Sequence, residues 1–143
     1  MAASNNGFKI DLPDGWEDQT IHYFMGPEES GLQHILSLQV DTQPSSNDLE
    51  EYARDRVEQM LESIPDAEVL KEEEKQLPSG AQAYEVVYKW APSEDKVVFQ
   101  KLVFVQHSKT MYNFNGTFTK KTIKTLGVEV DRMIQAFIPG SEL

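Results

Sequence analysis

Hydrophobic and polar residues alternate with a period of two through much of the chain, which predicts a protein built mainly from β-strands. Two such runs, at 17–25 and 33–41, flank a glycine- and proline-containing acidic segment, so an antiparallel hairpin is expected there. An earlier run at 8–12 has the same alternation and leads into the turn-forming sequence Pro13-Asp14-Gly15. The chain is therefore expected to begin with a strand that enters a turn.

The period changes to three and four residues after Pro44, which predicts an amphipathic helix of about four turns. Asn47 followed by Glu50 fits a capping box at its start, and Pro65 marks its end. The predicted buried positions of this helix are Leu49, Ala53, Val57, Met60, Leu61 and Ile64.

The rest of the chain predicts four more strands and a second helix. The first strand, at 68–76, contains Glu72, Glu73 and Glu74, which suits an exposed edge because charge prevents pairing between sheet edges. Thr119 is a plausible N-cap of the final helix, which is expected to end before Pro139-Gly140. The other three strands, at 81–91, 96–107 and 111–118, are expected to form an antiparallel meander.

The order of the elements predicts an α+β fold, an antiparallel β-sheet with helices packed on it. All 143 residues are expected to form one domain, with an ordered core at about 8–138. The strand at 96–107 has apolar residues on both faces, so both faces of the sheet are expected to be covered there. Two helices of modest length can hardly cover a whole sheet on both sides, which favours a homodimer.

Charge and composition narrow the classes of partner. The chain has 24 acidic and 13 basic residues and a formal net charge of −11. This charge repels phosphate backbones and anionic lipids, so neither nucleic acid nor a membrane surface is an expected partner. The absence of cysteine excludes disulfides, thiolate nucleophiles and cysteine-ligated zinc. Residues 1–7 have neither the basic nor the apolar region of a secretory signal, so a cytoplasmic location is expected.

Motifs that would indicate an enzyme or a cofactor are missing from the sequence. The glycines lack the spacing of phosphate-binding loops, and no metalloprotease, nucleophile-elbow or EF-hand motif is present. His22, His34 and His107 could meet at a metal ion, but no carboxylate stands beside them at ligand spacing, and ordinary strand histidines are the preferred interpretation. No cofactor, metal or catalytic activity is expected, although an enzyme with dispersed catalytic residues stays an open alternative.

Aromatic residues mark one face of the strand at 81–91. Tyr84, Tyr88 and Trp90 line this face, and a core position under a helix is preferred over a ligand-binding stripe. Trp16 is expected to close the end of the sheet in the same way.

The strand at 33–41 has a face of mixed chemistry. Leu36, Leu38 and Val40 form the side expected to face the core. The other side mixes an aliphatic residue with uncharged polar ones, which suits a concave surface that binds an apolar segment and donates hydrogen bonds to it. An ordinary half-exposed face is the alternative. The residues on this side are Ile35, Ser37 and Gln39.

Two segments carry a resemblance to a known family: FKIDLPDGW at 8–16 and YNFNGTF at 112–118. With these segments, and across residues 8–138, the chain resembles the small bacterial DcrB-like proteins of the Mog1/PsbP-like fold. Within that group it is similar to the effector-associated (Eag) chaperones of type VI secretion. The resemblance implies an α/β/α sandwich, a homodimer, and a cytoplasmic chaperone that shields apolar N-terminal helices of an effector before secretion.

On this hypothesis the mixed strand face binds the transmembrane-type helices of the client. A non-enzymatic module of the same fold that binds a different protein or a small ligand is the alternative. The residues expected to bind the partner are Ile21, Tyr23, Ile35, Ser37, Gln39 and Gln100.

Overall fold

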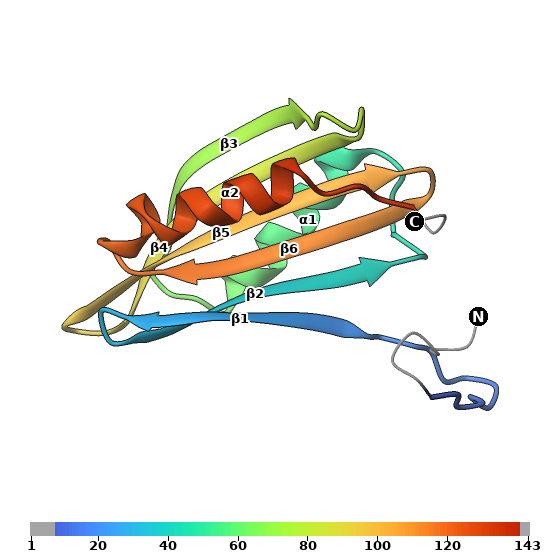
Figure 1. Ribbon diagram of the computed structural model, residues 1–143, viewed down its shortest axis with the longest axis horizontal. Coiled ribbons are helices and arrows are strands. Elements are labelled where there is room, and N and C mark those ends of the chain that lie inside the picture. Colours follow the sequence, from blue (N-terminus) through green and yellow to red (C-terminus); the bar gives the residue numbers. More distant parts are fainter. Residues whose placement is uncertain (1–7, 141–143) are drawn as a thin grey trace.

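The computed structural model describes residues 8–140, and the segment 1–7 considered above lies outside this range. Six strands, two α-helices and one 3-10 turn follow one another along the described chain (Figure 1). The elements are β1 (Ile21–Glu29), β2 (Leu32–Asp41), α1 (Leu49–Glu62), β3 (Glu68–Gln76), β4 (Gln82–Ser93), β5 (Lys96–His107), β6 (Thr110–Phe118), η1 (Thr122–Lys124) and α2 (Leu126–Gln135).

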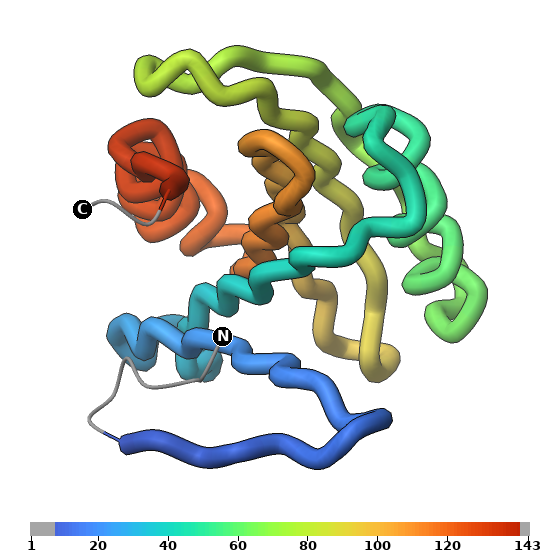
Figure 2. Tube along the Cα trace, turned by 90° about the vertical axis from the view of Figure 1, so that its right-hand side faces the viewer, coloured from blue at the N-terminus to red at the C-terminus, as the bar shows by residue number. Residues whose placement is uncertain are grey.

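All six strands belong to one antiparallel sheet with the order β1-β2-β6-β5-β4-β3. The expected α+β class and the antiparallel sheet are therefore confirmed. Figure 2 shows α1 and α2 on opposite sides of this sheet, which gives the three layers of an α/β/α sandwich. The expected edge position of the acidic segment is also confirmed, because β3 is an outermost strand of the sheet.

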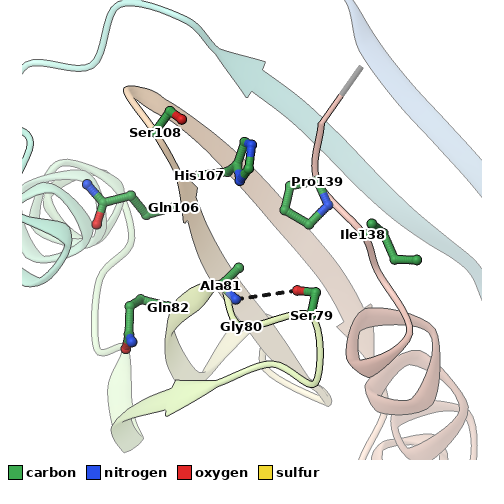
Figure 3. Close-up of a pocket in the computed structure, with 9 residues that line it drawn as sticks. All are labelled: Ser79, Gly80, Ala81, Gln82, Gln106, His107, Ser108, Ile138 and Pro139. Atoms are coloured by element: carbon green, nitrogen blue, oxygen red, sulfur yellow. Dashed lines mark hydrogen bonds between the residues drawn. The ribbon is translucent and has the colours of Figure 1, made fainter. Parts of the chain in front are cut away.

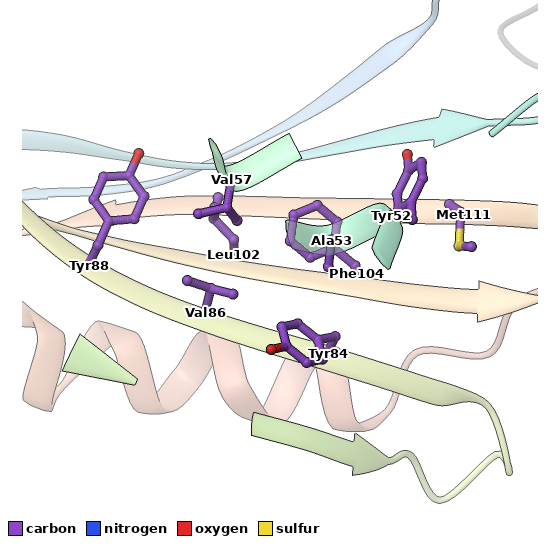
Figure 4. Packing of buried hydrophobic residues seen from close by; sticks show 9 residues of the cluster. All are labelled: Tyr52, Ala53, Val57, Tyr84, Val86, Tyr88, Leu102, Phe104 and Met111. Carbon is purple, nitrogen blue, oxygen red and sulfur yellow. The ribbon is translucent and has the colours of Figure 1, made fainter. Parts of the chain in front are cut away.

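Helix α1 covers the β4–β5 part of one sheet face. Tyr52, Ala53 and Val57 form its buried stripe, as the helical period predicts. The stripe packs on aromatic and aliphatic residues from three strands (Figure 4). Tyr84 and Tyr88 are among them and are buried, while Trp90 packs partly buried at the margin, so the core interpretation of this aromatic stripe is confirmed.

Helix α2 covers the opposite face of the same sheet. Its Ile134 joins a second buried cluster, and Phe137, just beyond the helix, packs against that cluster at its rim. The expectation that both faces of the later strands are covered is therefore confirmed. The sheet residues of this cluster come from the alternate positions of the strands and are Leu36, Ala83, Val103, Val105 and Phe114.

The helix starts differ from the predicted ones. Asp48, and not Asn47, is the N-cap of α1, because its carboxylate accepts a hydrogen bond of 3.1 Å from the backbone N–H of Glu51. Thr119 is not the N-cap of the final helix, because that helix, α2, begins after Thr125. The Thr119 hydroxyl instead accepts a hydrogen bond from the N–H of Thr122, at the start of the 3-10 turn. The helical segment therefore has two parts, η1 and α2.

The first hairpin is present but shifted along the chain. Strand β1 begins at Ile21 and continues beyond Gly26, through a register irregularity between Met25 and Glu28. The turn consists of Ser30 and Gly31, which both have positive φ angles, of 54° and 76°. Two successive positive φ angles are typical of the tight turns whose twist matches a hairpin.

Residues 8–20, called the N-terminal arm below, contain no strand, so the prediction of a strand at 8–12 is wrong. Alternation makes a segment suitable for a strand, but only pairing with a neighbour forms one. Trp16 does not close the end of the sheet, because its side chain is 72% exposed. Figure 2 shows the arm running apart from the sheet, below β1.

Candidate functional site

Helix α1 leaves part of its own sheet face uncovered. Its buried contacts are with β4, β5 and the start of β6, whereas β1 and β2 lie beyond it in the sheet. Figure 2 shows β1 past the part of the sheet that α1 covers. We call this uncovered surface the open face. Its side chains come from alternate positions of β1, β2 and β6, with Gln100 of β5 at its inner border.

Strand register brings all six residues predicted to bind a partner onto the open face. Ile21 lies opposite Gln39 and Tyr23 opposite Ser37, in the β1–β2 pairing. Directly paired residues of antiparallel strands point to the same side of a sheet. Ile35 is two residues from Ser37 and shares its side. Through β6, the pairs Ser37–Asn115 and Thr117–Gln100 extend the same face to β5.

Four further residues belong to this face and were not predicted. Met25 lies opposite Ile35. Asn113, Asn115 and Thr117 occupy the alternate positions of β6, opposite residues of β2 or β5. The signal that could have revealed the β6 residues is their alternation with Tyr112, Phe114 and Phe118, which separates a polar from an aromatic side.

The outer part of the open face is apolar. Tyr23 and Met25 are 66% and 72% exposed, and Ile21 and Ile35 keep more than a third of their side chains exposed. Contiguous exposed apolar residues of this size on a sheet are typical of a surface that meets another molecule.

The inner part of the open face is polar but uncharged. The Gln100 amide donates a hydrogen bond of 2.8 Å to Oδ1 of Asn115, and its carbonyl oxygen accepts one of 2.8 Å from the Thr117 hydroxyl. The Ser37 hydroxyl donates to the Asn115 backbone carbonyl at 3.4 Å. These bonds hold the side chains in place. Gln100 is itself buried at 7% exposure, at the border of the core, whereas Ser37, Asn115 and Thr117 are partly exposed. Hydrogen-bonding capacity remains in this row, since an amide has two N–H donors and its oxygen accepts twice.

A charged cluster closes one end of the open face, next to α1. The Asn113 amide donates to the Tyr52 hydroxyl at 2.8 Å, and that hydroxyl donates to Asp41 at 2.9 Å. Arg56 lies 3.8 Å from the same carboxylate oxygen and donates to Gln39 at 3.3 Å. Burial raises the pKa of Tyr52 to about 12, with the Asn113 bond opposing the shift and Asp41 adding to it. Tyr52 is therefore a neutral structural donor, and both charges of the cluster are paired.

The three histidines do not meet. His34 is buried in β2, with Nδ1 3.0 Å from the Pro27 carbonyl oxygen and Nε2 2.8 Å from the Thr122 hydroxyl. His22 stacks near Phe24 on β1, while His107 ends β5. Within residues 8–140, no three histidine, aspartate or glutamate side chains are grouped as metal ligands would be.

A second hollow lies away from the open face, between the loops that follow β3 and β5 and the segment after α2 (Figure 3). Ser79, Gln82, His107 and Ser108 line it, but their side chains are exposed. The Ser79 hydroxyl accepts a hydrogen bond from the Ala81 N–H at 3.4 Å, as in many tight turns. This hollow has the character of a gap between loops.

Comparison with solved structures gives the fold. A protein of unknown function from Pseudomonas aeruginosa is similar, with a TM-score of 0.78 and 17% identity over 99% of this chain and 97% of that one. PsbP from Synechocystis is similar with a TM-score of 0.51 and 10% identity, over 92% of this chain and 99% of that one. These likenesses confirm the Mog1/PsbP-like fold.

Comparison with protein sequences gives the family. No curated protein matches the chain. No helix in residues 8–140 has the length and apolar composition needed to cross a membrane. The family model described as DcrB matches residues 8–135, which is most of the chain. The protein therefore belongs to the DcrB family.

Proposed function

We propose that this protein is a cytoplasmic, non-enzymatic chaperone whose open face binds apolar, transmembrane-type helices at the N-terminus of a type VI secretion effector. One observation carries the proposal: the open face joins exposed aliphatic and aromatic side chains to a fixed row of uncharged hydrogen-bonding groups. Membership of the DcrB family and the resemblance to the Eag chaperones support the choice of a secreted effector as the client.

The chemistry of the open face matches the chemistry of such a helix. Helices that pack inside membranes expose aliphatic side chains together with small and hydroxyl-bearing residues that form hydrogen bonds with their neighbours. Ile21, Tyr23 and Ile35 offer apolar contact to the first group, and the Ser37 and Gln100 side chains offer hydrogen bonds to the second. In water, burying these exposed apolar surfaces against each other lowers the free energy of the complex.

The open face carries no unpaired charge, which favours the docking of an apolar helix. Burying a charge against an apolar helix costs several kcal/mol unless a partner accompanies it. Asp41 and Arg56 lie at the margin, and each has a partner there. An apolar helix can therefore dock without stripping water from an isolated ion.

The test uses a soluble reporter protein that carries an N-terminal apolar helix of leucine, alanine, glycine and serine. We expect co-expression with the wild-type chain to keep this fusion soluble and bound. Ile35→Arg or Ser37→Arg should abolish the capture, because each variant forces an unpaired charge into the complex. Met133→Arg is the matched control, since Met133 is similarly exposed but lies on α2, across the sheet.

Two results would contradict binding of an apolar helix at the open face. If the two open-face variants melt like the wild type and still hold the fusion, the helix binds elsewhere. If the wild-type chain captures no apolar helix at all, the chaperone function is wrong, and the alternative of a binding module for another partner takes its place.

A further inference from the structure

Apolar and charged side chains alternate at 8–12, in the outer part of the N-terminal arm. Successive side chains of an extended segment point to opposite sides, so this segment can place its apolar residues on one side and its charged residues on the other. It can therefore cover an apolar surface while its charges stay in water, where they cost least. The apolar residues are Phe8, Ile10 and Leu12, which are 51%, 53% and 42% exposed, and the charged ones are Lys9 and Asp11.

The base of the arm is attached at the open face. The Gln39 side chain, which belongs to this face, donates a hydrogen bond of 2.9 Å to the Gln19 side chain. Further along the arm, the Trp16 N–H donates to the Pro13 carbonyl at 3.2 Å, and Gly15 has a φ angle of 89°, as a tight turn with glycine at its third position requires. In Figure 2 the arm bends on the side of the sheet that carries α1, which is the side of the open face.

The open face has the exposed apolar surface that could receive the arm. The four apolar residues of its outer part are Ile21, Tyr23, Met25 and Ile35, and each keeps between 37% and 72% of its surface exposed. Their partners in the β1–β2 register carry no charge. Two apolar surfaces of one chain are therefore both in contact with water, and burying one against the other lowers the free energy of the molecule.

The arm is long enough to make this contact. Its base and its outer part are separated by residues 13–19, which span about 10 Å even with the turn folded, at about 3.3 Å for each extended residue. Neighbouring strands lie only about 4.8 Å apart, so both β1 and β2 are within reach. A segment tethered in this way meets its own open face at an effective concentration on the order of millimolar, so even a weak contact is populated.

We propose that residues 8–12 close over the open face of their own chain as a strap, with their apolar side on the outer part of the face, and that a client helix displaces them. The arrangement in Figure 2, with the arm apart from the sheet, is the open state that accepts a client. In the closed state the apolar side chains of the strap leave water, while Lys9 and Asp11 stay in it. The displacement rests on the function proposed above, whereas the closure depends on the arm and the open face alone.

A client helix binds the open face more strongly than the strap does. A helix of transmembrane type contains about 20 apolar residues, whereas the strap has only three large apolar side chains. Closure also orders the arm, and the lost conformational entropy weakens the closed state. Only the open state accepts a client, so the apparent affinity for every client is reduced in proportion to the fraction of open molecules. Long apolar helices still bind, while short or partly polar segments bind too weakly to displace the strap.

The first experiment locates the strap in the full-length protein without a client. The chain has no cysteine, so Lys9→Cys with Met25→Cys introduces the only two thiols and leaves the apolar side of the strap intact. A bis-maleimide with a short spacer should link them within one chain and give a monomer that migrates faster on a denaturing gel. The matched control is Lys9→Cys with Met133→Cys, which should not link, because Met133 is also exposed but lies on α2, across the sheet. No linkage of the first pair, linkage only between chains, or equal linkage of both pairs overturns the closure.

The second experiment measures the competition between the strap and a client, by titration of the full-length wild type and two arm variants with the reporter helix described above. Ile10→Asp puts a charge on the apolar side of the strap. It should bind the helix about tenfold more tightly than the wild type, as expected if the strap is closed in about nine of ten molecules. Lys9→Asp is the control, because it places the same side chain on the side that faces water, and it should bind like the wild type.

The outcomes of the titration separate the strap from the chaperone function. Equal affinities of the wild type and Ile10→Asp for the helix overturn the displacement, although the chaperone function stands. If none of the three proteins binds the helix, the chaperone function is wrong and the displacement with it, while the cross-linking result still decides whether the strap closes.

Discussion

The hydroxyl of Tyr52 donates a hydrogen bond of 2.9 Å to Oδ2 of Asp41, which joins helix α1 to the end of strand β2 beside the open face. The same hydroxyl accepts the Asn113 amide at 2.8 Å, so one buried oxygen connects the helix to two strands. These bonds lie where α1 stops covering the sheet and the open face begins.

Tyr52→Phe should therefore destabilise the fold by about 1–3 kcal/mol at neutral pH, because the Asn113 amide loses its acceptor in a buried site. Urea unfolding measures the difference. Tyr112→Phe is the control: its ring packs against Phe137, and its hydroxyl has no hydrogen-bond partner among residues 8–140, so the loss should stay below about 0.5 kcal/mol. Equal losses in both variants would contradict a structural role for the Tyr52 bond.

The effect of Tyr52 should also depend on pH. Because burial raises its pKa to about 12 from the usual 10.0, the fold favours the protonated phenol. This contribution is complete below pH 10 and is lost as the pH rises through 12, by about 3 kcal/mol in total. The stability difference between wild type and Tyr52→Phe should therefore shrink across that interval. A constant difference would contradict the pKa shift.

Glu85 supports the other side of the sheet. Its buried carboxylate lies 3.0 Å from the ammonium groups of both Lys71 and Lys75, and 3.8 Å from that of Lys101. Burial alone would raise the pKa of Glu85, but Lys71 and Lys75 outweigh it and lower the pKa below 4.5. The ionised carboxylate is therefore the form that the fold stabilises.

Glu85→Gln should cost about 3–5 kcal/mol at pH 7, because it leaves several lysines around a neutral group. Since the folded pKa is lowered, the contribution is complete above the unfolded value and is lost as the pH falls through the folded one. The two proteins should therefore approach equal stability in acid. Glu73→Gln, which removes only an exposed pair with Lys71, should change stability by less than about 1 kcal/mol. Denaturant unfolding at several pH values gives all three comparisons.

The periodicity of the sequence correctly predicted the features that depend only on residues close together in the chain. Helical spacing predicted that Ala53 and Val57 lie on the buried side of α1. The continuous apolar run of β5 predicted that both faces of this strand are buried. The prediction of a strand at 8–12 was wrong for a physical reason. These residues alternate as in a strand, but a strand also needs a neighbouring strand to pair with, and the local sequence does not reveal whether one is present.

The open face could be predicted only in part for the same reason. Period two placed Ile35, Ser37 and Gln39 on one side of their strand correctly. Gln100 belongs to the open face only because β6 pairs with β2 on one side and with β5 on the other. Strand β6 lies about seventy residues or more after β2 in the chain. Because the position of β6 between β2 and β5 is a long-range property, Asn113, Asn115 and Thr117 were missed although their alternation was visible.

Gln100 gives the sharpest test of the polar part of the open face, under the proposed chaperone function. Gln100→Leu removes the amide between Thr117 and Asn115 but keeps a side chain of similar size at the border of the core. Its two former partners are only partly buried, so water can satisfy them and the fold should lose less than about 1.5 kcal/mol. The variant therefore separates hydrogen bonding to the client from folding.

We expect Gln100→Leu to bind a reporter helix that contains serine and glycine about tenfold more weakly than the wild type, a loss of about 1.4 kcal/mol. A helix of leucine and alanine alone offers no hydroxyl to the missing amide, so its affinity should be unchanged or higher. Gln82→Leu, at an exposed position of β4 away from the open face, should bind both helices like the wild type. Titration of the purified wild type and of both variants with both fusions measures the six affinities. If Gln100→Leu weakens both helices equally, the amide maintains the shape of the face and does not select hydroxyl-bearing clients.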